Sequence, residues 1–237
     1  MDQLCAAAAE IGLKGVDLLQ PDEYEVPKRY GLRCTMGYVS GGDLGARTAL
    51  NRLEDHDEIE RMFRSGMPRA AKAGVVNVIT FSGWRKGITD EDGLRNTIVG
   101  LNRVKKIAED SGISLCLELL NSKLDHLGYM ADHTAWGVRV VEEVNSPNVK
   151  LLYDIYHMQI MEGDLIATIQ RNIQWIGHFH TGGVPGRHEL DDSQEVNWVA
   201  VMKAIAATSY GGYVAHEFRP TGDPLESLRQ AADLCDV

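Results

Sequence analysis

The stretch LLYDIYHMQ, residues 151–159, decides the fold class of this chain. It begins with apolar residues in a row, as a strand buried on both faces does, and the run stops at Asp154. His157 follows three residues later. Strands buried on both faces belong to parallel sheets that helices cover, and a buried polar group needs a partner. The stretch therefore predicts an α/β protein with polar side chains gathered at the carboxyl end of its sheet.

The same alternation of short apolar runs and helical segments repeats along the chain. Gly12, Gly74 and Gly112 close three of the helical segments, which is typical of helix ends. We expect strands over residues 15–19, 32–39, 75–81, 113–120, 149–154, 175–180 and 213–218. We expect helices over residues 2–11, 22–30, 55–73, 90–110, 133–144, 164–172, 198–207 and 224–234. Because a helix follows each strand, the pattern indicates a parallel sheet covered by helices.

Seven strand–helix units indicate a (β/α)8 TIM barrel with its first strand missing. Such a barrel closes with eight strands, and here Met1 leads directly into the first helical segment. We expect a gap between the first and last strands, with unpaired edges that a partner must cover. No linker or low-complexity tract divides residues 1–237, so we interpret them as a single barrel domain.

Side-chain alternation directs polar groups of four successive strands toward one place. Residues two apart on a strand face the same side, and the leucines at alternate positions of 115–119 suit the side facing the helices. Glu118 then points into the barrel. By the same rule Asp154, His180 and Glu217 point inward from the carboxyl ends of the next three strands. That end of a TIM barrel carries the active site.

Three carboxylates in one buried pocket require a compensating cation. Their repulsion and desolvation would otherwise force some of them to take up protons. We predict one divalent metal ion held by Glu118, Asp154, His180 and Glu217. Three oxygen ligands and one imidazole suit Mn²⁺ or Mg²⁺, and the ligand types leave Zn²⁺, Co²⁺ and Ni²⁺ open. For any one carboxylate alone, a helix cap or a salt bridge is the simpler interpretation.

The composition favours a small-molecule partner. The net charge is −10, from 34 acidic and 24 basic residues, which argues against binding of nucleic acid. The four cysteines show no CxxC spacing and no cleavable signal precedes them, so we expect reduced thiols and a cytoplasmic protein. The longest apolar runs fall far short of the roughly 20 residues that span a bilayer, so we expect no membrane association.

Four motifs carry a resemblance to a known family: LELLN at 117–121, YDIYHMQ at 153–159, HFHTGGVPGRHE at 178–189 and HEF at 216–218. In this order and spacing they resemble the xylose-isomerase-like barrels, most closely the hydroxypyruvate isomerase branch, which lies near the ketose 3-epimerases. The resemblance covers essentially the whole chain and is specific from Glu118 onward. Two departures are the family's first strand, absent here, and His180, where some hydroxypyruvate isomerases carry glutamine and the epimerases histidine.

The resemblance implies a metal-dependent isomerase of a small hydroxy-carbonyl compound, such as hydroxypyruvate, tartronate semialdehyde or a ketose. It implies that the four strand-end residues hold the metal and that Glu118 and Glu217 also move the proton through an enediolate. It assigns substrate oxygens to His157 and Arg187. Barrels of this family commonly associate as dimers or tetramers, so a homo-oligomer is expected.

Other interpretations stay open from the residues. A sugar epimerase or a dehydratase, a lyase that expels a β-hydroxyl, would use the same scaffold, and a degenerate barrel would bind without catalysis. Phosphodiester cleavage would need more histidine and aspartate ligands and a basic surface, which this acidic chain lacks. His157 could cap a helix, and Arg187 could be a solvated loop residue. Glu189 is expected to orient Arg187 or line the pocket, and His178 to support His180 from below.

Overall fold

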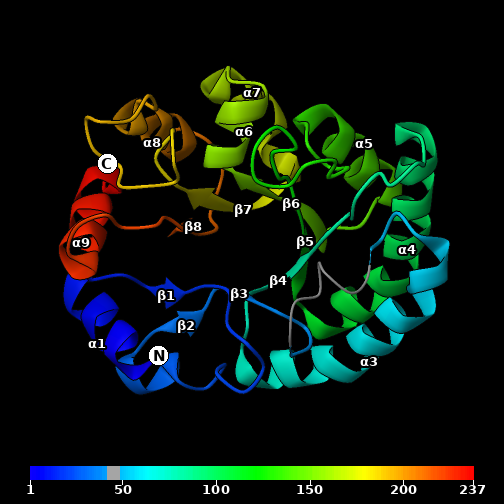
Figure 1. Ribbon diagram of the computed structural model, residues 1–237. Coiled ribbons are helices and arrows are strands. Elements are labelled where there is room, and N and C mark those ends of the chain that lie inside the picture. The colour runs from blue at the N-terminus through cyan, green and yellow to red at the C-terminus, as the bar shows by residue number, and fades with distance from the viewer. Residues whose placement is uncertain (42–48) are drawn as a thin grey trace.

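The computed structural model describes residues 1–41 and 49–237, in which strands and helices alternate (Figure 1). The strands are β1 (Gly15–Val16), β2 (Arg33–Cys34), β3 (Met36–Gly37), β4 (Asn77–Thr80), β5 (Ser114–Glu118), β6 (Val149–Asp154), β7 (Ile176–Thr181) and β8 (Val214–His216). The α-helices are α1 (Asp2–Ile11), α3 (His56–Ala73), α4 (Asp90–Ser111), α5 (Thr134–Val144), α6 (Ile155–Met161), α7 (Leu165–Asn172), α8 (Trp198–Ala206) and α9 (Pro224–Cys235). Short 3₁₀ turns lie at Pro27–Tyr30, Leu53–Asp55 and Ile173–Trp175.

The strands form a curled parallel sheet with the helices on its outer side (Figure 1). Strands β3 to β8 pair in sequence order, and every pairing is parallel. Strand β1 pairs with β2, and a bridge from Leu19 to Gly37 continues that pairing toward β3. Because parallel neighbours in chain order need a crossover each time, the helices cover the outside of the barrel. The predicted TIM-barrel architecture is confirmed.

Each stretch predicted as a strand contains strand residues, with three differences in detail. The stretch 32–39 is divided at Thr35 into β2 and β3. The last strand ends at His216, so Glu217 lies one residue past it. Helix α6 follows β6 without any loop, where no helix was expected. The predicted helix ends agree with the structure: Gly12, Gly74 and Gly112 end their helices with φ angles of 96°, 72° and 65°.

The interior of the barrel below the strand ends is filled by a small apolar cluster. Met36, Ile79, Cys116 and Leu152 are each at most 1% exposed and form a group separate from the larger core between the sheet and the helices. Cys116 and Leu152 lie two residues before Glu118 and Asp154, which confirms the alternation used to direct those carboxylates inward.

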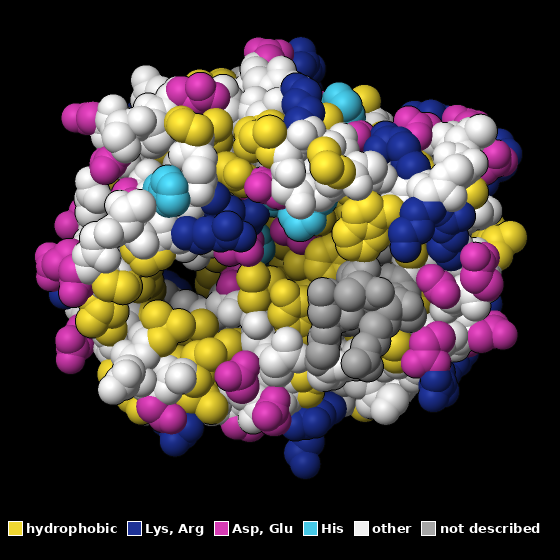
Figure 2. Space-filling view, in the orientation of Figure 1, with side chains coloured by type: hydrophobic (Ala, Val, Ile, Leu, Met, Phe, Trp, Pro, Cys, Tyr) yellow, Lys and Arg dark blue, Asp and Glu magenta, His cyan; other side chains and the backbone are white. Residues whose placement is uncertain are grey.

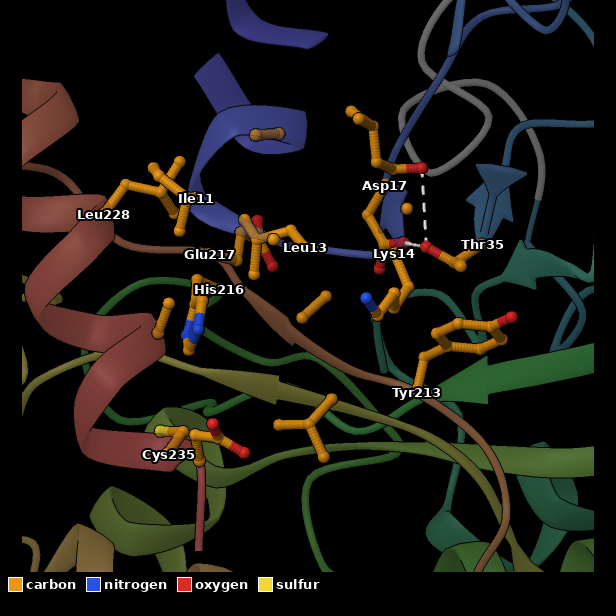
Figure 3. A pocket seen from close by; sticks show the side chains of 18 of the residues that line it. Ile11, Leu13, Lys14, Asp17, Thr35, Tyr213, His216, Glu217, Leu228 and Cys235 are labelled. Atoms are coloured by element: carbon orange, nitrogen blue, oxygen red, sulfur yellow. Dashed lines mark hydrogen bonds between the residues drawn. The ribbon is translucent and has the colours of Figure 1, made fainter. Parts of the chain in front are cut away.

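The sheet is open between β8 and β1. These two strands do not pair with each other in the described parts of the chain. A cavity of about 740 Å³ lies there, lined by α1, α9 and both strand edges (Figure 3). On the face shown in Figure 2 a dark hollow bordered by hydrophobic side chains lies left of centre. We call this opening the seam; it is the gap predicted between the first and last strands.

Among the described residues, no helix combines the length and the apolar character that crossing a membrane requires.

Candidate functional site

Four side chains predicted to converge do meet at the carboxyl ends of the strands. Glu118 and Asp154 end β5 and β6, His180 lies near the end of β7, and Glu217 follows β8. One oxygen or nitrogen atom from each of the four lies within 4.8 Å of the others, a spacing that could hold a metal ion. We call these four residues the acidic group. Parallel neighbouring strands bring their carboxyl ends to one edge, which is why consecutive strands supply it.

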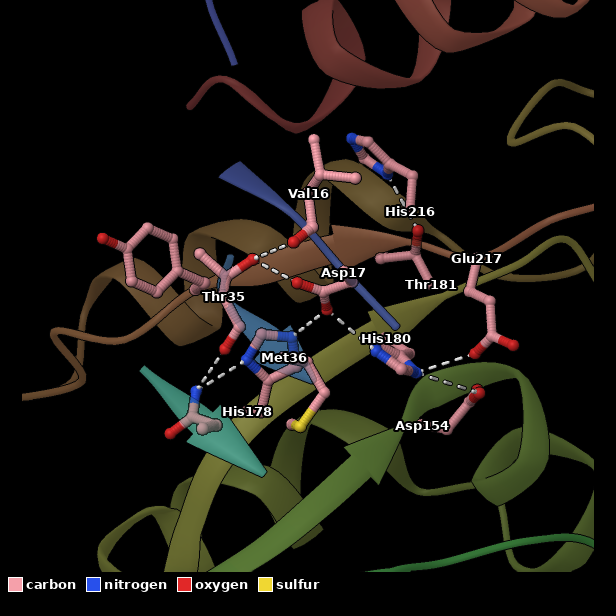
Figure 4. A network of polar contacts seen from close by, with 12 residues as sticks. Val16, Asp17, Thr35, Met36, Asp154, His178, His180, Thr181, His216 and Glu217 are labelled. Atoms are coloured by element: carbon pink, nitrogen blue, oxygen red, sulfur yellow. Dashed lines mark hydrogen bonds and ion pairs between the residues drawn. The ribbon is translucent and has the colours of Figure 1, made fainter. Parts of the chain in front are cut away.

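Within the acidic group, His180 directs one ring nitrogen, Nδ1, toward the three carboxylates. Its Nδ1 atom lies 2.8 Å from Glu217 Oε2, 3.7 Å from Glu118 Oε1 and 4.0 Å from Asp154 Oδ2. Figure 4 marks the ion-pair contacts of this atom with Glu217 and Asp154 as dashed lines. None of the three contacts has the geometry of a hydrogen bond, so the buried atom has no hydrogen-bond partner among the described residues. A buried polar atom without a partner is costly, and three carboxylate oxygens around it fit a bound cation.

Asp154 reaches the acidic group because it also starts a helix. Its Oδ1 atom accepts the backbone N–H of His157 at 3.2 Å, which is the N-cap bond of α6. Its Oδ2 atom faces the acidic group. The carboxylate thus ends β6, caps α6 and faces the site, and its side chain is fully buried.

Arg187 enters the acidic group from the loop after β7. Its Nη2 atom lies 2.7 Å from Asp154 Oδ2 and 2.6 Å from Glu217 Oε2, and its Nε donates to the Glu217 carbonyl at 3.0 Å. A Cβ atom on Gly182 would come within 3.0 Å of Arg187 Cγ, so the glycine leaves room for this side chain. The two acids raise the pKa of Arg187 despite the opposing effect of its burial. Arg187 is therefore a buried, paired cation, not a solvated loop residue.

His157 lies on the first turn of α6 with a fixed tautomer. The backbone N–H of Asn121 donates to its Nδ1 atom at 3.1 Å, so the ring proton of the neutral form is on Nε2. That atom lies 2.6 Å from Arg187 Nη1. Burial, and then the charge of Arg187, lower the pKa of His157 well below its ordinary value. The ring is held neutral, with a donor facing the site.

The two glutamates differ in their affinity for a proton. Burial, together with the charges of Glu217 and Asp154, raises the pKa of Glu118 to about 7 against the opposing effect of the nearby His180. Burial also favours the neutral form of Glu217, but the charges of His180 and Arg187 outweigh it and lower the pKa of Glu217. Their exposures differ as well, because the Glu118 side chain is 7% exposed and that of Glu217 35%.

The sequence analysis missed Asp17, which follows β1 directly. Its Oδ2 atom lies 2.5 Å from His178 Nε2 and 3.1 Å from His180 Nε2 (Figure 4). Asp17 lies in the middle of the stretch 15–19 predicted as a strand, so a search for polar groups at strand ends did not find it. His178 shares the Asp17 carboxylate with His180, and the two rings pack edge to face with their centroids 5.3 Å apart.

Glu189 does not orient Arg187. Its carboxylate accepts hydrogen bonds from the backbone N–H groups of Thr221 and Gly222 and from the hydroxyls of Thr221 and Ser227. It therefore ties the loop after β7 to the loop that precedes α9. The expectation that Glu189 orients Arg187 is wrong, because the nearest donors come from a segment more than 30 residues away.

The comparisons with known proteins agree with the fold and indicate the reaction class. Residues 5–236 match the family model described as "Xylose isomerase-like TIM barrel". The chain is 31% identical over 232 residues to the 2-oxo-tetronate isomerase of Cupriavidus necator, covering 93% of this chain and 87% of that protein. It is 26% identical over 234 residues to the hydroxypyruvate isomerase of Escherichia coli, covering 94% and 89% of the two chains. Both relatives are named as isomerases, as the motifs predicted.

A solved structure shows the same architecture. The crystal structure of an AP endonuclease, family 2, from Brucella melitensis superposes with a TM-score of 0.86 and 26% sequence identity, covering 96% of this chain and 90% of that one. Together with the match to the family model over nearly all residues, this likeness shows that the chain belongs to the xylose isomerase-like TIM barrel family.

Proposed function

We propose that this chain is a divalent-metal-dependent isomerase of a small hydroxy-carbonyl compound. One observation carries the proposal: Glu118, Asp154, His180 and Glu217 bring one ligand atom each within 4.8 Å of the others at the carboxyl end of the barrel. The relatives named 2-oxo-tetronate isomerase and hydroxypyruvate isomerase support the reaction class. Sugar epimerisation is the alternative, because it uses the same type of proton transfer. The resemblance supports it in one respect: the family's epimerases carry a histidine at the position of His180.

The ligand set favours Mn²⁺ or Mg²⁺, with Zn²⁺, Co²⁺ and Ni²⁺ as alternatives of the same charge. Such an ion would polarise the carbonyl and hydroxyl oxygens of the substrate and would stabilise the charge that develops when the neighbouring carbon loses its proton. Arg187 pairs with Asp154 and Glu217, so a bound ion would compete with its guanidinium for these oxygens.

Glu217 and Glu118 divide the proton transfer. Isomerisation removes a proton from one carbon and delivers a proton to its neighbour, so it needs a base and an acid on the two sides of the reacting carbons. Surroundings that separate the pKa values of two carboxyl groups identify such a pair. Glu217, whose pKa is lowered, takes up the proton, and Glu118, whose pKa is raised to about 7, holds and returns one.

His157 and Arg187 hold substrate oxygens. His157 Nε2 and Arg187 Nη1 lie 2.6 Å apart and both carry protons, so no hydrogen bond joins them and each needs an acceptor beside it. An oxygen of the substrate supplies that acceptor. A carboxylate fits best, because its two oxygens can accept from His157 Nε2 and from Arg187 Nη1, the guanidinium nitrogen that is not paired with Asp154 or Glu217. The substrate is therefore a hydroxy-carbonyl acid of the size of hydroxypyruvate or 2-oxo-tetronate.

The proposal extends to the domain organisation, the compartment and the oligomeric state. Residues 1–237 act as a single domain on a small molecule in the cytoplasm, where free cysteines such as the buried Cys5, Cys34 and Cys116 stay reduced. We expect a homo-oligomer, a dimer or a tetramer, and sedimentation of the purified protein measures it.

The experiment that tests the function is solvent exchange into candidate substrates. Purified protein is analysed for bound metal and then incubated in deuterated water with hydroxypyruvate, 2-oxo-tetronate and ketoses. We expect metal-dependent deuterium uptake and isomerised product. Glu217→Gln should slow uptake at least about 100-fold, because general acid–base catalysis contributes that much. Glu143→Gln, on the exposed side of α5, is the matched control.

The products separate the alternatives. An epimerase returns the proton to the same carbon, and a dehydratase yields a product lighter by one water. Deuterium uptake that is independent of metal, or that survives Glu217→Gln unchanged, contradicts the proposed mechanism.

A further inference from the structure

Asp17 is the centre of a buried polar network that joins β1 to β7. Its Oδ2 atom contacts the Nε2 atoms of both His178 and His180, and its Oδ1 atom accepts the hydroxyl of Thr35 (Figure 4). Both imidazoles are fully buried and Asp17 is 11% exposed. Asp17, His178 and His180 also lie close enough together to hold a cation of their own. The positions of the ring protons distinguish a cation site from a network of hydrogen bonds.

Asn77 fixes the protons of His178. The Asn77 Nδ2 atom donates to the carbonyl oxygen of Thr35 at 3.0 Å, which sets the orientation of the amide, because a carbonyl can only accept. The same Nδ2 atom lies 3.3 Å from His178 Nδ1, which must therefore accept. His178 then carries its ring proton on Nε2 and donates it to Asp17. In this tautomer His178 Nε2 has no free lone pair, so the arrangement favours the hydrogen bond to Asp17 over a second cation at Asp17 and His178.

His180 receives its orientation from the same carboxylate. Its Nε2 atom donates to Asp17 Oδ2 at 3.1 Å, and its Nδ1 atom, on the other side of the ring, faces the acidic group without a hydrogen-bond partner in the described residues. A metal-ligating histidine presents one nitrogen to the ion while a hydrogen bond on the other fixes the tautomer and the ring plane. Asp17 stands in that relation to His180.

We propose that Asp17 is a positioning residue that holds the proton of His180 on Nε2 and thereby presents Nδ1 as a metal ligand. The inference rests on the proposed metal site and adds a residue that touches neither the ion nor the substrate. It also explains why a carboxylate sits in the barrel interior next to two buried rings. Without it, two buried N–H groups lose their acceptor and the ring of His180 is free to turn.

The first test locates the ring protons in the wild-type protein. Long-range ¹H–¹⁵N NMR spectra of the histidines, with His180 assigned from the spectrum of His180→Gln, show which nitrogens are protonated. We expect His180 Nε2 to carry a proton both without and with saturating Mg²⁺, and the Nδ1 signal to change when Mg²⁺ is added. An unprotonated Nε2 in either state overturns the inference, whatever any variant does.

The second test measures Mn²⁺ binding by calorimetry in three variants. Asp17→Ala should weaken Mn²⁺ binding by about 10- to 100-fold, the usual effect of removing the partner of a ligating histidine. Asp17→Asn should stay within about threefold of wild type, because its Oδ1 can accept from both imidazoles while its Nδ2 donates to the Thr35 hydroxyl, which in turn donates to the Val16 carbonyl. Asp22→Ala, exposed in the same segment of the chain, is the matched control.

The outcomes separate this inference from the function on which it rests. Wild-type protein that binds Mn²⁺, with Asp17→Ala binding it equally well, refutes the role of Asp17 alone. Wild-type protein that binds no Mn²⁺ refutes the metal site and this role together. If Asp17→Asn has a native circular dichroism spectrum but binds Mn²⁺ as weakly as Asp17→Ala, the hydrogen bonds of Asp17 are not the reason why it matters for Mn²⁺ binding. Asp17→Asn can keep every hydrogen bond of the network. We therefore expect it to fold, and the inference stays testable, even if Asp17→Ala does not fold.

Discussion

Asp154 Oδ1 accepts the backbone N–H of His157 at 3.2 Å, while the other oxygen of the same carboxylate lies 2.7 Å from Arg187 Nη2. The residue thus has a helix-capping role and a site role that use different oxygens. Two substitutions separate these roles, because asparagine caps helices as well as aspartate does and alanine does not.

Asp154→Asn and Asp154→Ala should weaken metal binding alike but differ in stability. Both remove the charged ligand, and we expect at least a tenfold loss of Mn²⁺ affinity in each. Asp154→Ala should in addition be less stable than Asp154→Asn by about 1 kcal/mol, the usual contribution of an N-cap. Urea unfolding in the presence of a chelator measures the difference. Equal midpoints for the two variants would show that the cap of α6 contributes nothing.

Arg187→Lys should raise KM more than it lowers kcat. A lysine keeps the charge, but its single nitrogen cannot pair with Asp154 and Glu217 and also donate to the substrate. Hydrogen bonds to charged groups contribute about 1.5–3 kcal/mol, which is about 10- to 100-fold in KM. Steady-state kinetics with a carboxylate substrate check this. Arg171→Lys changes an exposed arginine paired with Asp164 and should leave KM unaltered. An unchanged KM in Arg187→Lys would remove the arginine from substrate binding.

Glu189→Gln should destabilise the protein at neutral pH and not in acid. Burial alone would raise the pKa of Glu189, but hydrogen bonds from the Gly222 and Thr221 amides outweigh it and lower the pKa to about 2. The unfolded value is about 4.3. The native state therefore favours the ionised form, and this stabilisation is complete above about pH 5 and is lost as the pH falls toward 2.

We expect Glu189→Gln to cost about 1–2 kcal/mol at pH 7, because an amide cannot accept all four hydrogen bonds. Urea midpoints at pH 7, 5, 4 and 3 should converge with those of wild type as the pH falls. Asp192→Asn, exposed in the same loop, is the control and should follow wild type throughout. A gap that stays constant with pH contradicts the assignment.

Leu152→Ala should cost about 2–5 kcal/mol of unfolding free energy. Leu152 is fully buried in the interior cluster with Met36, Ile79 and Cys116, and truncation leaves a cavity that the barrel strands cannot collapse to fill. Leu124→Ala removes the same atoms from a side chain that is 67% exposed and should change stability by less than about 0.5 kcal/mol. Similar costs for both variants would mean that the cluster contributes little.

The acidic group could be predicted from the sequence because its geometry depends on local rules. Alternation along a strand and the shared edge of parallel strands place Glu118, Asp154, His180 and Glu217 without knowledge of any loop. The same rules missed Asp17, because β1 has only two strand residues and offers little alternation to read. They also missed α6, because its capping residue Asp154 was interpreted as a strand end and a metal ligand.

The contacts of the loop after β7 could not be predicted in this way. Arg187 has a φ of 59°, which L-residues rarely adopt, and its partners come from β6 and the end of β8. Glu189 binds backbone amides at Thr221 and Gly222, and nothing near it in the sequence indicates those donors. Such contacts depend on how two distant loops pack, and no periodicity encodes that.

The seam leaves the sheet an open arc and not a ring. In a closed ring, each strand is held by a neighbour on both sides. Here Glu217 follows β8, the last strand of the arc, whereas Glu118 ends β5, which has a neighbour on each side. Bending of the arc therefore changes the separation of the two glutamates directly. Asp17 links β1 to β7 through the interior and resists that bending. The contacts of Asp17 with His178 and His180 thus help to hold the curvature of the sheet, and with it the spacing of Glu118 and Glu217.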